Sequence, residues 1–194
     1  MQTKCIGLIV GMLLLPLACF GQYTVSESGV WGATAPTTTW SAPNASWSYS
    51  FVVNTNPVVS NYSLGNNFTA AFSNFTYTLN GSPVATTPAS IVWYSSALSG
   101  LFNINFSTAS FFQIFGSQAY SGPENSPTIL RGTYPINAGS FFRSSGNADQ
   151  PLSGSVTISG NPNPVPALSQ LGLIALAVTL LALGAWQLRR GVAA

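Results

Sequence analysis

The alternation of polar and aromatic residues is the feature that most constrains the fold of this chain. Residues 46–51 read Ser-Trp-Ser-Tyr-Ser-Phe, so every second side chain is aromatic. Successive side chains of a β-strand point to opposite faces, and this spacing therefore places all three rings on one face. The same habit continues through residues 68–79, where we expect a strand with a bulge near residues 70–71. Asn80-Gly81 follows directly and predicts a tight hairpin turn.

Further short strand candidates, separated by turn residues, cover much of the central region. They are residues 91–94, 101–106, 110–115, 128–131, 140–143 and 154–159. No stretch of this region has convincing helical periodicity. Many short strands with turn residues between them are typical of antiparallel all-β domains. We therefore expect an all-β fold, either an antiparallel β-sandwich or a jelly-roll-like domain.

Residues 1–21 have the layout of a secretory signal peptide. Lys4 gives the segment a positive start, and a predominantly apolar stretch follows. Cys19 and Gly21 are small residues at the spacing that signal peptidase prefers, so we expect cleavage before Gln22.

An alternative reading makes residues 15–19, Leu-Pro-Leu-Ala-Cys, a lipobox in which Cys19 carries a lipid. Cys5 and Cys19 are the two cysteines of the chain, and both lie in this segment. Cleavage before Gln22 therefore leaves a mature chain without a disulfide. The domain that we expect over residues 22–159 must rely on its own core.

The C-terminal part predicts a membrane anchor. Residues 171–188 contain no charged side chain, and eighteen residues rise about 27 Å as a helix, close to the roughly 30 Å hydrocarbon core of a bilayer. Trp186 lies near the end of this segment, and Arg189 and Arg190 follow at once. Because positive residues stay on the cytoplasmic side, we expect one transmembrane helix with residues 189–194 as a basic cytoplasmic end.

Residues 160–170 connect the predicted domain to this helix. They begin with Gly-Asn-Pro-Asn-Pro, a stiff linker whose prolines cannot join a sheet. We therefore place the end of the secreted domain at residue 159, and we treat residues 160–170 as linker and sorting motif.

The predicted domain offers little for catalysis. Its charged residues are Glu27, Glu124, Arg131, Arg143 and Asp149, and the chain has no histidine. A Ser-His-Asp triad is thereby excluded, and zinc lacks its usual ligands. Glycoside hydrolysis needs two facing carboxyl groups, whereas we expect these acids to be solvated in loops. We therefore expect no enzyme, no catalytic residue, no cofactor and no metal, and the domain has no basic patch for nucleic acid.

Trp31 and Trp40 are candidates for a sugar-stacking surface. They lie beside the sequence Gly-Ala-Thr-Ala-Pro, which makes them the most plausible exposed tryptophans. The rings of the alternating strands are expected to fill the core instead. A carbohydrate-binding or adhesive module, with extracellular polysaccharide as the partner, therefore remains an alternative function.

The last thirty residues resemble the C-terminal sorting signals of bacterial exosortase substrates, which combine a short motif, a transmembrane helix and a basic end. The IPTL-CTERM type has a pattern like Ile-Pro-Thr-Leu-Ser-x-Trp-Gly, and the residues that fit it are Val165, Pro166, Leu168, Ser169 and Gly172. Ala167 replaces the threonine, and Leu171 replaces the tryptophan. The PEP-CTERM motif, Val-Pro-Glu-Pro, is matched at Val165 and Pro166.

This resemblance implies a substrate of a membrane sorting enzyme rather than an enzyme. The tail would hold the exported chain in the inner membrane, and an exosortase-type transpeptidase would cut near residues 166–169. The body would then pass to the cell surface or extracellular matrix as a structural protein. A permanently membrane-anchored envelope protein is the alternative, in which the tail stays intact.

Overall fold

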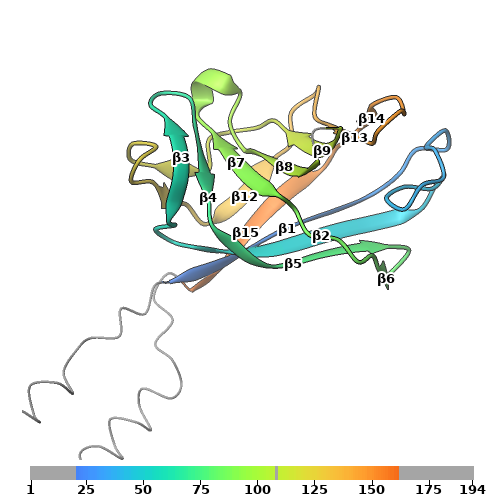
Figure 1. The fold of residues 1–194 in the computed structure, drawn as a ribbon, viewed down its shortest axis with the longest axis horizontal. Helices are drawn as coiled ribbons and strands as arrows, with labels where there is room; N and C mark the ends of the chain where they lie inside the picture. Colours follow the sequence, from blue (N-terminus) through green and yellow to red (C-terminus); the bar gives the residue numbers. More distant parts are fainter. Residues whose placement is uncertain (1–20, 108, 162–194) are drawn as a thin grey trace, which may run out of the picture. The chain divides into compact units, whose positions relative to one another are not determined.

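A computed structural model describes residues 21–107 and 109–161, which form an all-β domain (Figure 1). Its strands run antiparallel in their sheets, and the 3-10 turn η1 (Ser96–Leu98) is the only helical segment within these residues. The expectation of an all-β, antiparallel domain is confirmed. Apart from Gly21, the signal peptide predicted over residues 1–21 lies outside the described residues, and so do the predicted sorting motif, transmembrane helix and basic end. Over the described ranges, no helix has the length and apolar character needed to cross a bilayer.

The first sheet, named sheet A, has six strands in the order β12-β15-β1-β2-β5-β6. Their bounds are β1 (Gln22–Val30), β2 (Ser46–Asn54), β5 (Phe72–Leu79), β6 (Ser82–Pro83), β12 (Gly132–Pro135) and β15 (Ser155–Asn161). β1 and β2 pair over nine residues, from Gln22 opposite Asn54 to Val30 opposite Ser46. β1 also pairs with β15 on its other side, and it therefore lies in the middle of the sheet.

The second sheet, named sheet B, has seven strands in the order β14-β13-β9-β8-β7-β4-β3. Their bounds are β3 (Val59–Ser63), β4 (Asn67–Ala70), β7 (Ser90–Tyr94), β8 (Phe102–Ser107), β9 (Ser110–Ile114), β13 (Phe141–Arg143) and β14 (Gln150–Pro151). A separate short pair, β10 (Tyr120–Ser121) with β11 (Thr128–Ile129), completes the strands.

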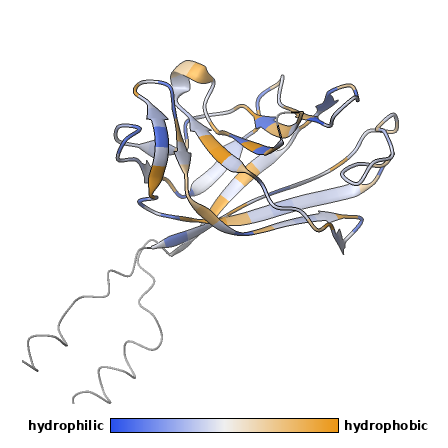
Figure 2. Ribbon diagram, in the orientation of Figure 1, coloured by the Kyte–Doolittle hydropathy of each residue, from blue (hydrophilic) through white to orange (hydrophobic). Residues whose placement is uncertain are grey.

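Aromatic side chains from the two sheets meet in the core. Trp47, Tyr49 and Phe51 alternate along β2 and are all buried. Their rings contact Phe102 and Phe112 of sheet B at centroid distances of 5.5 to 5.7 Å. In Figure 2 most of β2 is pale, because Ser, Trp and Tyr all have hydropathy values near zero. The two sheets therefore pack in a sandwich-like manner, as the alternation predicted. The inward face of β2 differs from its outward face in carrying large aromatic rings, not in carrying aliphatic side chains.

Residues 68–79 do not form one bulged strand. The chain leaves β4 at Ala70 and enters β5 at Phe72, and these two strands belong to different sheets. The break in alternation at Ala71 is therefore a change of sheet rather than a bulge. The predicted turn is confirmed, because Asn80 and Gly81 have φ values of 51° and 75° and join β5 to β6.

The two ends of the described domain lie side by side. Gln22 at the start of β1 pairs with Asn161 at the end of β15, and Tyr23 pairs with Gly160. The last strand, predicted over residues 154–159, therefore extends two residues further, to Asn161. Gly160 and Asn161 join the sheet because the prolines of the predicted linker begin only at residue 162.

Candidate functional site

The outward face of sheet A carries rows of hydroxyl groups. Because Tyr49 and Phe51 face the core, the alternate residues Ser48 and Ser50 face outward. On the neighbouring strands, the residues that pair with these serines are also Ser or Thr, so the outward hydroxyls extend across five strands. The resulting first hydroxyl row pairs Thr133 with Thr157, Thr157 with Ser26, Ser26 with Ser50, and Ser50 with Thr76.

A second hydroxyl row runs parallel to the first and contains Ser28, Ser48 and Thr78. Neighbouring strands lie about 4.8 Å apart, which brings hydroxyls on paired residues within hydrogen-bonding reach. Ser48 and Thr78 share a hydrogen bond of 2.8 Å, and Ser50 and Thr76 share one of 2.9 Å. A hydroxyl both donates and accepts, so these rows can also bond to groups outside the protein.

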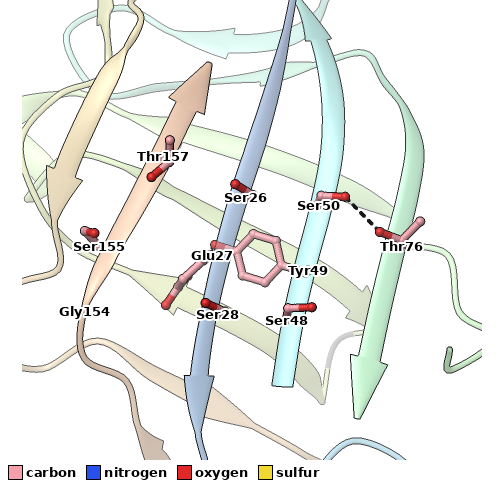
Figure 3. A pocket seen from close by; sticks show the side chains of 10 residues that line it. All are labelled: Ser26, Glu27, Ser28, Ser48, Tyr49, Ser50, Thr76, Gly154, Ser155 and Thr157. Atoms are coloured by element: carbon pink, nitrogen blue, oxygen red, sulfur yellow. Dashed lines mark hydrogen bonds between the residues drawn. The ribbon is translucent and has the colours of Figure 1, made fainter. Parts of the chain in front are cut away.

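A groove of about 550 Å³ lies over these rows and crosses β15, β1, β2 and β5 (Figure 3). The residues that line it are Ser26, Glu27, Ser28, Ser48, Tyr49, Ser50, Thr76, Gly154, Ser155 and Thr157. Seven of these residues are Ser or Thr, and only Glu27 and Tyr49 are titratable. The groove is therefore a hydrogen-bonding surface, because its outward side chains carry hydroxyl groups, whereas the side chains of Glu27 and Tyr49 face the core.

Glu27 lies opposite Tyr49 on the inward side of sheet A, and its residue is only 4% exposed. The Tyr49 hydroxyl donates a hydrogen bond of 2.5 Å to Glu27 Oε2, while Glu27 Oε1 is buried and has no partner. Burial raises the pKa of Glu27 from 4.5 to about 8, although the bond from Tyr49 opposes this change. The neutral carboxylic acid is therefore the favoured form of Glu27 at pH 7, and this buried acid adds no charge to the outward face of sheet A.

Glu124 is also buried, at 7% exposure, although it lies in the loop between β10 and β11. Its Oε2 accepts a bond of 2.9 Å from the Gly65 backbone N–H, and its Oε1 accepts one of 2.8 Å from the Tyr120 hydroxyl. The bond from Gly65 is the main cause of the lowered pKa of Glu124. Glu124 therefore fastens this loop to the β3–β4 turn as an ionised carboxylate.

The expectation that the acids are solvated in loops is thus wrong for Glu27 and Glu124, which are both buried. Asp149 is partly exposed and pairs with Arg143, whose Nε lies 2.6 Å from Asp149 Oδ1. The three acids therefore have separate partners, and none faces another. Over the described ranges, no group of three or more His, Cys, Asp or Glu side chains could hold a metal ion.

Neither Trp31 nor Trp40 lines the groove. Trp31 is 2% exposed and stacks on Trp47 with ring centroids 5.1 Å apart, so the expectation that it is exposed is wrong. Its Nε1 donates a bond of 3.0 Å to the Trp40 carbonyl, which draws the segment after β1 back over the core. Trp40 is partly buried against Tyr77 and Phe106, so only part of its ring remains accessible.

The sorting-motif candidates and the basic stop lie outside the described residues. They are Val165, Pro166, Ala167, Leu168, Ser169, Gly172, Arg189 and Arg190. The hydroxyl rows were missed at the sequence level, although the serines of residues 46–51 gave a signal. Wherever alternate side chains fill the core, the residues between them must form the opposite face.

Comparison with known proteins adds no family to this description. No protein-family model matches the chain, and neither the curated proteins nor the solved structures contain a significant match. A function must therefore be inferred from the described domain and from the residues at the two ends of the sequence.

Proposed function

We propose that this chain is an exported, non-enzymatic protein of the cell surface or extracellular matrix, and a substrate of an exosortase-type transpeptidase. The observation that carries this proposal is the order of three features in the tail. A motif from Val165 to Gly172 precedes the uncharged residues 171–188, and Arg189 and Arg190 follow them. The tail holds the exported chain in the inner membrane, and cleavage near residues 166–169 releases the body.

The composition of the described domain supports a role outside the cell. Its core is built from aromatic rings and needs no disulfide, and its surface is nearly uncharged. The pairing of Gln22 with Asn161 brings the two ends of the described domain side by side, which supports attachment of the domain from one end of sheet A. The domain therefore has one point of attachment to the membrane while the tail is intact. A jelly-roll-like arrangement of the strands and a single C-terminal transmembrane helix are parts of the same proposal.

Mass spectrometry of the mature protein from its native host tests the proposal. We expect an N-terminus at Gln22 and a C-terminus near residues 166–169. Deletion of residues 165–194 is expected to change both the size and the envelope retention of the mature protein. Unchanged processing and location after this deletion would contradict the proposal.

The same spectra separate the alternatives. A mature chain that keeps residues 171–194 identifies a permanently membrane-anchored envelope protein. A lipid-modified N-terminal Cys19 identifies a lipobox instead of cleavage before Gln22.

A second candidate function, the binding of an uncharged polysaccharide, is favoured by the hydroxyl rows. Ser and Thr hydroxyls donate and accept, as sugar hydroxyls do, and the neutral groove gives no advantage to an ionic ligand. A net hydrogen bond contributes only about 1 kcal/mol, so one sugar unit gains little. An extended polymer repeats the contact across neighbouring strands and gains by multivalency.

Ser48→Val and Ser50→Val together test this second function, because valine suits a strand but cannot hydrogen-bond. We expect the double variant to lose at least about tenfold in retention on insoluble neutral polysaccharides such as cellulose or chitin. Thr87→Val removes an exposed hydroxyl outside the rows and serves as the matched control. Loss of retention in Trp40→Ala, but not in the double variant, would assign binding to the tryptophan instead.

A further inference from the structure

Three of the four edge strands of the two sheets contain a proline. Sheet A ends in β6 with Pro83 and in β12 with Pro135, and sheet B ends in β14 with Pro151. Proline has no N–H to donate, so it hinders the addition of another strand at an edge. The fourth edge strand, β3 (Val59–Ser63), contains neither a proline nor a charged residue. β3 is therefore the one strand of these four without a proline, and its register with β4 shifts between Val59 and Asn61.

Large apolar side chains are exposed at this same edge. Val58 is 70% exposed, Tyr62 is 50% exposed and Leu64 is 62% exposed. They are three of the six large hydrophobic residues that are exposed among the described residues. Four of the five β3 residues are themselves exposed. The strand therefore combines an open edge with exposed apolar side chains.

The neighbouring turn holds β3 in place. The Gly65 N–H donates to Glu124, and the Gly65 carbonyl accepts a bond of 2.7 Å from the Ser95 hydroxyl. The Ser95 N–H in turn donates to the Asn66 carbonyl at 2.7 Å. An edge that is already ordered loses little conformational entropy when another strand joins it.

We propose that β3 pairs antiparallel with β3 of a second copy of this chain, which joins the two copies of sheet B into one continuous sheet. Residues 58–64 contain no charge, so two copies meet at this edge without like-charge repulsion. The exposed apolar residues of each copy cover those of the other. A charged peptide would find no opposite charge along β3, which makes a second copy the better partner.

The proposed pairing produces a dimer and no larger assembly. Both copies use the same edge, so the contact is isologous and leaves no free β3. Pro83, Pro135 and Pro151 restrict growth at the remaining edges, which separates this dimer from a fibre.

Sedimentation of the full chain in a mild detergent, over a range of protein concentrations, tests the pairing. We expect the wild-type chain to pass from monomer to dimer as its concentration rises. Val58→Lys and Tyr62→Lys each place a charge at the edge and are expected to weaken the dimer at least about tenfold. Val30→Lys is the matched control, because Val30 is 67% exposed at the end of β1, and this variant should dimerise like the wild type.

Two further measurements keep the test decisive. Far-ultraviolet circular dichroism and the thermal midpoint must be close to the wild-type values in all variants, which shows that each lysine variant is folded. Amide hydrogen exchange of residues 59–63 is expected to slow with concentration in the wild type and in Val30→Lys only. A chain that stays monomeric at every concentration overturns the proposal, and so does a dimer that survives both lysine substitutions at the β3 edge.

Discussion

At the scale of single residues, Glu27 links the protonation of one carboxyl group to the stability of the domain. Burial raises its pKa in the folded chain to about 8, whereas the unfolded chain releases this proton near 4.5. The folded state therefore binds the proton more tightly than the unfolded state does. The stabilisation is complete below about pH 4.5 and is lost as the pH rises through 8.

Glu27→Gln is expected to remove this pH dependence. Between about pH 5 and about pH 9 the free energy of unfolding of the wild-type chain should fall by an amount on the order of a few kcal/mol. The glutamine variant should lose much less over the same range. Urea unfolding followed by tryptophan fluorescence measures both slopes, and equal slopes would contradict the assignment. Glu124→Gln is the control, because the pKa of Glu124 is lowered rather than raised and this acid therefore adds no comparable loss of stability over this range.

Substitution of Glu124 gives a second prediction for a single residue. Glu124→Ala leaves the Gly65 N–H and the Tyr120 hydroxyl without their buried acceptor, which should cost about 1–3 kcal/mol. Faster hydrogen exchange at Gly65 should accompany the loss. Asp149→Ala removes an acid from an exposed pair and should change stability by less than about 1 kcal/mol. An equal effect of both substitutions in urea unfolding would show that Glu124 is not a fastening residue.

At the scale of strands and turns, local sequence predicted some elements and failed for others. β2 was predictable because every inward position from Trp47 to Phe51 is aromatic, and the Asn80-Gly81 turn has a strong local signature. β1 was missed because Glu27 occupies an inward position and breaks the apolar pattern. Only its pairing with β2 and β15 establishes this strand, and no local pattern encodes that pairing.

The candidate site was even less accessible from the sequence. Its groove depends on the register of strands that are distant along the chain, such as β15 and β1. The burial of Trp31 depends in the same way on the long segment between β1 and β2, which returns over the core. The local composition favoured an exposed Trp31, whereas packing against the core buries it.

The turn between η1 and β8 provides a prediction at this scale. Gly100 has a φ of 61°, and a Cβ at this position would lie 2.3 Å from the Gly116 carbonyl oxygen. Gly81 also has a positive φ, but a Cβ there meets nothing within 4 Å. Gly81→Ala should cost about 1–2 kcal/mol for its backbone conformation alone. Gly100→Ala should cost at least about 2 kcal/mol more in urea unfolding because the backbone must also move, and equal costs would exclude the clash.

At the scale of the whole molecule, the near absence of charge sets the response to salt. Residues 22–159 contain five charged side chains, and the Arg143–Asp149 pair is partly exposed, with side chains 47% and 39% accessible. Screening by salt acts on interactions between charges, so the domain has little electrostatic stability to lose. Its stability comes from burial of the aromatic core instead.

We therefore expect the thermal midpoint of the domain to change by less than about 2 °C between about 0.05 M and about 0.5 M sodium chloride. Sodium sulfate should raise the midpoint, because it is excluded from the surface and strengthens apolar burial. Differential scanning calorimetry measures both effects. A large decrease in sodium chloride would indicate an electrostatic contribution that the described contacts do not contain.

Because Gln22 pairs with Asn161, the two ends of the domain are adjacent, which suits the domain to circular permutation and to insertion into another protein. A short peptide link between these neighbours would close the backbone into a ring without disturbing either sheet. New ends could then be opened at Gly146, in an exposed turn between β13 and β14 where a Cβ added to the glycine would meet no atom within 4 Å. The same geometry allows the domain to be grafted into a surface loop of another protein, where its two ends would occupy little more room than a hairpin.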